Sequence, residues 1–152
     1  MDPMKIVQEA LEKASAGLTM PSEANASFAF VAGTGVVSGP ITAALIRAQL
    51  GAQHDALIGR VVTGEGGKLA DKTEVEVRAA QEFFEHFAAA ADPNDAWSVE
   101  RAKRLTALLE VLSSELSGLV VVRFGAVTIS TFLVGRTSDG HLAGLLTAQV
   151  ET

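Results

Sequence analysis

Three histidines, His54, His86 and His141, are the residues of this chain best suited to bind a metal or transfer a proton. None of them belongs to an HExxH or HxH pattern, and no cluster of aspartates and glutamates stands at ligand spacing around them. The chain has no cysteine, which excludes a disulfide, a thiolate metal site and a thiol nucleophile. We therefore expect the histidines to be surface or structural residues, and the protein to hold no cofactor.

Two glycine-rich stretches have part of the pattern of phosphate-binding turns. In TGEGGKLA (63–70) glycines precede Lys68, but Leu69 follows the lysine and the GxxxxGK[ST] spacing is absent. GTGVVSG (33–39) stands between a predicted strand and a predicted helix and misses the GxGxxG spacing by one position. Flexible loops explain both stretches better than a nucleotide site. Because no serine lies in a GxSxG turn either, the residues favour a binding module over an enzyme.

The charge and hydropathy of the chain exclude several classes of protein. Its 152 residues carry a net charge of −6, which argues against a nucleic-acid binder and suits a basic protein partner. The most apolar stretch, GLVVVRFGAVTISTFLVG, is interrupted by Arg123 and has the composition of strands, so we expect no membrane span. The N-terminus lacks the pattern of a signal peptide, which makes a cytoplasmic location the default.

Helical periodicity and helix-end signals predict the α-helical part of the fold. Asp2-Pro3 opens the first helix, and Pro40 and Gly51 frame the second. The turn DPNDAWS (92–98) caps the last and longest helix. The predicted helices cover 2–17, 38–51, a segment from Ala80 to Ala91, and a long segment that carries Leu105, Leu108, Leu109, Leu112 and Leu116 on one face.

Alternating and β-rich segments predict the sheet. The expected strands are 28–33, a weak one at 57–62, an edge strand at 73–77, and then 120–124, 126–135 and 141–150. Short turns between the last three indicate antiparallel pairing, and helices on both sides of the β segments indicate an α/β/α sandwich. The last strand runs almost to the chain end, which leaves only Glu151 and Thr152 beyond it.

Several segments together resemble the cyanobacterial-type nuclease A inhibitors, small proteins that block a sugar-nonspecific endonuclease. The resemblance covers most of 5–31 and roughly 74–152, and this chain carries extra residues around 60–73. The segments that carry it are KASAGLTMPSE (13–23), PIT (40–42), Phe83-Phe84, DPNDAW (92–97), LLEVLSSEL (108–116), VVRFGAVTISTFLVGRTSDGHLAG (121–144) and the terminal VET (150–152).

The resemblance implies a fold and a function. The fold would be a single α/β domain over 1–152, an α/β/α sandwich similar to the plant pathogenesis-related class 1 proteins, with a mainly antiparallel sheet in its C-terminal half. The function would be that of a cytoplasmic, non-enzymatic inhibitor that forms a one-to-one complex with a magnesium-dependent endonuclease and binds neither nucleic acid nor membranes. The alternative is a protein-binding module of the same fold with a different or lost target.

The resemblance also assigns residues to partner binding. Glu23 matches a loop glutamate that pairs with active-site arginines of the nuclease, and Thr152 matches a terminal threonine that reaches its catalytic magnesium. Asp95 and Trp97 match an acidic-aromatic pair at the family's interface, here separated by Ala96. Without the resemblance, Glu23 would be interpreted as a solvated loop carboxylate, and Trp97 equally well as a residue packed at a helix start.

Overall fold

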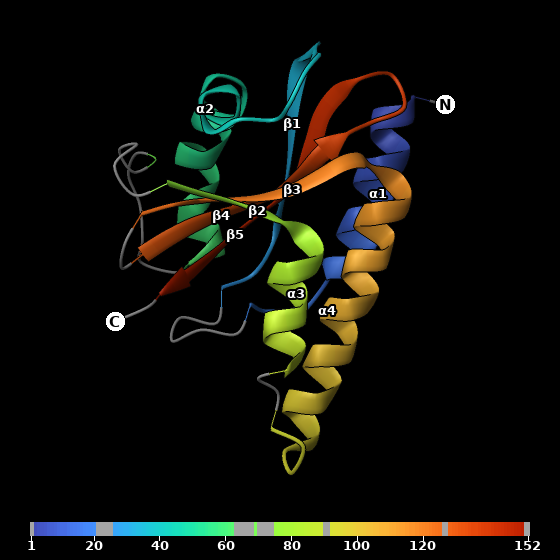
Figure 1. Ribbon diagram of the computed structural model, residues 1–152, viewed down its shortest axis with the longest axis vertical. Helices are drawn as coiled ribbons and strands as arrows, with labels where there is room; N and C mark the ends of the chain where they lie inside the picture. The colour runs from blue at the N-terminus through green and yellow to red at the C-terminus, as the bar shows by residue number, and fades with distance from the viewer. Residues whose placement is uncertain are drawn as a thin grey trace.

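The protein forms one mixed structure of helices and strands around a single sheet (Figure 1). A computed structural model describes residues 2–20, 26–62, 69, 75–89, 92–125 and 128–150. The elements in chain order are α1 (Pro3–Ser15), β1 (Ala29–Val36), α2 (Ala43–Val61), β2 (Val75–Ala79), α3 (Ala80–Ala89), α4 (Ala96–Glu115), β3 (Ser117–Phe124), β4 (Thr128–Arg136) and β5 (His141–Val150).

The sheet is antiparallel throughout, with the strand order β1-β5-β4-β3-β2. The C-terminal strands β3, β4 and β5 pair in sequence order, as the short turns between them predict. Strand β2 lies at one edge, which confirms the expected edge strand, and β1 forms the other edge against β5. The last strand of the chain is therefore a central strand, hydrogen-bonded on both sides.

Two hydrophobic layers cover the two faces of the sheet. Helix α2 packs on one face, and α1, α3 and α4 pack on the other (Figure 1). Successive residues of β4 alternate between the layers: Phe132 and Val134 face α2, while Leu133 faces the three-helix layer. The buried leucines of α4 include Leu105, Leu108 and Leu112, the stripe predicted from the sequence. The α/β/α sandwich is thus confirmed.

The second helix differs from the prediction. The sequence predicts a helix over 38–51 and a strand over 57–62, but α2 runs without interruption from Ala43 to Val61. Its N-cap is Thr42, whose hydroxyl accepts a hydrogen bond from the Leu45 backbone N–H at 3.2 Å. The glycine at position 51, read as a stop signal, lies inside the helix. A glycine costs about 1 kcal/mol there, and the packing of α2 on the sheet outweighs that cost.

The stretch GTGVVSG is not a phosphate-binding turn. Gly33 and Gly35 lie within β1, which extends to Val36 instead of ending at position 33. A Cβ atom added at Gly33 would come within 2.1 Å of the Gln49 Oε1 atom of α2. Gly33 is therefore a buried strand position packed against Gln49, whose flexible side-chain end would have to move for a larger residue. Most of the other glycine-rich stretch, 63–72, lies outside the described residues.

Candidate functional site

The turn before α4 holds two of the predicted partner-binding residues, Asp95 and Trp97. Asp95 is the N-cap of α4, and its carboxylate accepts a hydrogen bond from the Trp97 backbone N–H at 3.1 Å. The turn is braced by the Asp92 carboxylate, which accepts from the Asn94 N–H at 2.9 Å, and by the Ser98 hydroxyl, which accepts from the Asp92 N–H at 3.1 Å. These bonds fix the direction in which the start of α4 points.

The Trp97 side chain faces solvent. It is 59% exposed, so it does not pack into the core at the helix start. The Arg101 guanidinium lies 4.2 Å from the centre of the Trp97 ring, a cation–π contact one helical turn away. Partial burial lowers the pKa of Arg101 and the Asp95 carboxylate acts in the opposite direction, but an arginine stays charged at neutral pH. The exposed Asp95 and Trp97 and the half-buried Arg101 thus form one surface at the start of α4.

The loop that carries Glu23 has fixed ends. Residues 21–25 lie outside the described part of the chain, and Glu23 is among them. The residues on either side, Met20 and Ala26, are buried, and the Met20 N–H donates to the Ala26 carbonyl oxygen at 2.8 Å. The described residues on the two sides of 21–25 are therefore held together in the core.

The C-terminal strand is anchored close to the same segment. The Thr147 hydroxyl of β5 donates to the Ser27 carbonyl oxygen at 2.8 Å, and β5 continues to Val150, paired with Thr128 of β4. Gln149 is buried as well. Thr152 lies outside the described residues, two positions beyond the last one, so its predicted role stays a prediction.

Segments distant in sequence meet around residues 16–20. A small hollow is lined by Gly17, Leu18 and Thr19 together with Trp97, Glu100, Arg101 and Arg104. The Arg104 guanidinium donates to the Ala16 carbonyl oxygen at 2.6 Å. The structure therefore places Trp97 next to residues 17–19, which precede the segment of Glu23. It places Ser27, which follows that segment, next to Thr147 of β5.

Sequence reasoning missed a buried polar group between α2 and β4. The His54 Nε2 atom lies 2.7 Å from the Ser130 Oγ atom, and its Nδ1 atom lies 2.8 Å from the Asp55 Oδ1 atom. This is the order of groups found in serine hydrolases. The only signal in the sequence was the His54-Asp55 pair, because Ser130 is 76 positions away.

The Ser130–His54–Asp55 group has a structural role. His54 is 2% and Ser130 6% exposed, within the layer between α2 and the sheet, so the hydroxyl is closed to a substrate. Asp55 also accepts a hydrogen bond from the Leu69 N–H at 2.9 Å. The group ties α2 to β4 and to position 69. Within the described residues, no three histidine or acidic side chains form a group that could hold a metal ion.

Replacing Ser130 by alanine is expected to lower the free energy of unfolding by about 1–3 kcal/mol, because the His54 Nε2 atom is left buried without a partner. Urea unfolding of the variant measures the change. Ser113→Ala, at an exposed position of α4, is the control. His54→Leu combined with Ser130→Ala should recover part of the loss, since both buried partners are then apolar. Equal stability of Ser130→Ala and Ser113→Ala would contradict the assignment.

The capping role of Asp95 predicts a difference between two substitutions. Asp95→Ala removes the acceptor of the Trp97 N–H and should lower the free energy of unfolding by about 1 kcal/mol. Asp95→Ser keeps a capping oxygen without the charge and should stay within a few tenths of a kcal/mol of the parent protein. Chemical unfolding of the two variants side by side measures the effect, and a serine variant as unstable as the alanine variant would rule it out.

None of the helices in the described part of the chain is both long and apolar enough to cross a lipid bilayer. A comparison with curated protein sequences found no match. Residues 5–152, nearly the whole chain, match the family described as nuclease A inhibitor-like protein. The match spans the segments that carry the sequence resemblance. It also spans the part around 31–74, where that resemblance is thin. The chain belongs to the nuclease A inhibitor-like family.

Proposed function

We propose that the protein inhibits a sugar-nonspecific, magnesium-dependent endonuclease by covering its active site in a one-to-one complex. The observation that carries the proposal is the match of residues 5–152 to the inhibitor-like family. In this proposal the protein is not itself an enzyme, acts in the cytoplasm, holds no cofactor and touches neither nucleic acid nor membrane. Its net charge of −6 favours association with the basic residues by which a nuclease handles phosphate.

The proposed binding surface consists of Glu23, Asp95, Trp97 and Thr152. Glu23 would accept a forked, charge-assisted hydrogen bond from an arginine of the nuclease. Thr152 would bring a hydroxyl and an α-carboxylate to the catalytic magnesium, which prefers oxygen ligands. Such groups imitate the negative charge of a phosphodiester and offer no bond to cleave.

The described anchors support this arrangement. Trp97 shares a hollow with residues 17–19, just before the loop of Glu23, and Ser27, just after that loop, is bonded to Thr147 of the C-terminal strand. Both termini of the loop and the base of the chain end are fixed by buried residues. Preorganised binding groups lose little conformational entropy when a complex forms.

A titration with purified nuclease tests the function. The protein is added in increasing amounts to a sugar-nonspecific nuclease from the same genome. Cleavage is followed with a DNA duplex as substrate in one series and with RNA in the other. Inhibition of both activities, complete at one equivalent, is the expected result. If the nuclease keeps its activity and capture from the source cell yields another protein as the main partner, the fold serves as a binding module with a different target.

Trp97→Ala is expected to weaken inhibition about ten- to thirtyfold and leave the free energy of unfolding within about 0.5 kcal/mol of the parent. We expect inhibition to change and stability to stay the same because the Trp97 ring is 59% exposed. The ring therefore adds little to the core and is available to a partner. Ile6→Ala is the matched control, since Ile6 is also an exposed large apolar residue, 44% exposed on α1. Equal inhibition by the two variants would remove Trp97 from the interface.

A further inference from the structure

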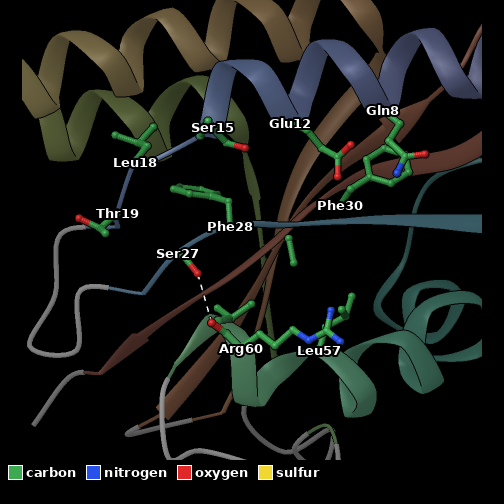
Figure 2. A pocket seen from close by; sticks show the side chains of 14 residues that line it. Gln8, Glu12, Ser15, Leu18, Thr19, Ser27, Phe28, Phe30, Leu57 and Arg60 are labelled. Atoms are coloured by element: carbon green, nitrogen blue, oxygen red, sulfur yellow. Dashed lines mark hydrogen bonds between the residues drawn. The ribbon is translucent and has the colours of Figure 1, made fainter.

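A groove of about 500 Å³ runs along the free edge of β1 between α1 and α2 (Figure 2). Phe28 and Phe30 turn their rings toward the α1 side, while Ala29 packs toward α2. Glu12 of α1 and Arg60 of α2 lie on opposite sides of the strand, as Figure 2 shows. The floor of the groove is thus a strand edge, and its walls carry opposite charges.

The backbone of this edge offers hydrogen-bonding groups that point away from the sheet. The Ala32 N–H donates to Gln53 Oε1 at 3.0 Å, and the Gln53 Nε2 atom donates back to the Ala32 carbonyl oxygen. Ala32 therefore directs both groups away from β5, although it stands opposite Ala143. Because outward and inward pairs alternate in an antiparallel ladder, Phe30, two residues earlier, also directs its N–H and C=O outward.

Gln53 satisfies the outward groups of Ala32 as a neighbouring strand would. Among the residues that the structure describes, no group bonds to the outward N–H and C=O of Phe30. Unpaired backbone groups of an edge strand are a template for another extended chain. This stretch of the edge lies between Ser27, whose N–H donates to the Val61 carbonyl oxygen at 3.0 Å, and Ala32, which Gln53 covers.

The walls restrict what can enter. An added strand would place successive side chains alternately toward α1 and toward α2. A side chain directed to α1 would meet the Glu12 carboxylate, and the next one would meet the Arg60 guanidinium. Neither charge has a side-chain partner among the described residues. A basic and an acidic residue at adjacent positions point to opposite faces of the added strand and therefore match both walls. A basic and an acidic residue two positions apart point to the same face and match only one wall.

We propose that the β1 edge binds a short extended peptide segment that carries a basic and an acidic residue at adjacent positions. The segment adds as a strand beside Phe30, with its basic side chain at Glu12 and its acidic side chain at Arg60. The six residues from Ser27 to Ala32 span about 17 Å, five steps at the rise of a strand, which sets the length of the segment. This inference does not depend on nuclease inhibition.

The experiment uses two capped hexapeptides of identical composition. Acetyl-VTKETV-amide has its lysine and glutamate on opposite faces of a strand, and acetyl-VKTETV-amide has both on one face. Each is titrated into the 15N-labelled full-length protein, and backbone amide shifts are followed by NMR. We expect saturable shifts centred on Phe30, slower exchange of the Phe30 amide proton, and about two- to fivefold weaker binding of the second peptide, the ratio typical of one exposed ion pair.

Two further sets of variants test the walls and the backbone separately. Glu12→Lys and Arg60→Glu should each weaken binding of the first peptide about two- to fivefold, whereas Lys13→Glu, exposed on the same helix but outside the groove, should not. N-methylation of the peptide, one residue at a time, should weaken binding about five- to tenfold at alternate residues and leave it unchanged at the others. The reason is that only alternate N–H groups of the peptide face the protein.

Several results would overturn the inference. They are the absence of saturable shifts with either peptide, equal affinity for both peptides, shifts that avoid Phe30, and N-methyl effects without alternation. Shifts of the Phe30 amide on dilution of the free protein would show that a second copy of the chain occupies the edge, and would equally refute a peptide site.

Discussion

Replacing Glu23 by lysine is expected to raise the inhibition constant against the target nuclease about a hundredfold or more. Breaking a close, desolvated charge pair at an interface costs about 2–5 kcal/mol, and each 1.4 kcal/mol is a factor of ten in affinity. The lysine adds repulsion from the arginines that the glutamate is proposed to pair with. Steady-state inhibition measured at two salt concentrations gives the effect and its electrostatic part.

The control for Glu23→Lys is Glu9→Lys. Both substitutions replace a −1 group by a +1 group and so change the net charge from −6 to −4. Glu9 is exposed on α1, away from residues 16–20. A general loss of attraction would affect the two variants equally, whereas a direct contact affects Glu23→Lys alone. Glu23→Gln, which keeps an acceptor oxygen, should fall between the parent and the lysine variant. Equal inhibition by all three variants would exclude Glu23 from the binding surface.

The layers of the fold could be predicted from the sequence because most helices and strands have a clear local sequence pattern. Residues of α4 repeat at helical spacing, and its start has a capping turn. The three C-terminal strands are separated by turns too short for anything but antiparallel neighbours. The length of α2 was predicted wrongly from its local pattern, because contacts with distant parts of the chain determine it. Its buried stripe, at spacings of four and three residues, consists of Ile46, Leu50, His54, Ile58 and Val61.

Two residues explain why the length of α2 was predicted wrongly. Gly51 was taken as a stop signal, and the polar His54 interrupts the apolar stripe just beyond it. The histidine fits only because Ser130 of β4 and the adjacent Asp55 satisfy both of its ring nitrogens. Neither the partner strand nor its register can be derived from the local pattern. The prediction failed at a glycine that lies inside the helix and at a buried polar contact that replaces an apolar one.

The site residues were named mainly by family resemblance, and their roles stay predictions. It named Glu23, Asp95, Trp97 and Thr152, of which the residues alone had singled out only Trp97, either as an interface residue or as one packed at a helix start. What the structure adds is which anchors meet. Trp97 shares a hollow with residues 17–19, a relation between positions nearly 80 apart that no spacing rule contains. Trp97 is also more exposed than a residue packed at a helix start would be.

Extending the chain beyond Thr152 is the second prediction of large effect. Two residues, Gly-Ser, added at the C-terminus convert the α-carboxylate of Thr152 into a peptide bond and place new atoms where the magnesium of the nuclease is proposed to lie. We expect the inhibition constant to rise about a hundredfold or more, the range of the strongest interface positions. The same dipeptide added at the N-terminus is the matched control and should leave inhibition unchanged.

Two further variants identify which group of Thr152 acts. Thr152→Val removes the hydroxyl and keeps both the shape and the α-carboxylate, whereas the Gly-Ser extension keeps the hydroxyl and removes the carboxylate. Magnesium releases its waters reluctantly and favours charged oxygen ligands, so the extension should weaken inhibition more than the valine does. Deletion of Thr152 moves the carboxylate one residue back and should resemble the extension in effect.

The folded state should not respond to any of these changes at the chain end. Strand β5 is paired on both sides, and its described ladder with β4 includes Val150, two positions before the altered residue. The thermal midpoints of all three variants should therefore match that of the parent protein. A central strand described as far as Val150 supplies a rigid base for a binding group that follows it. If the extended protein inhibits as well as the parent, the chain end is not in the active site, and the proposed surface reduces to the loop of Glu23 and the start of α4.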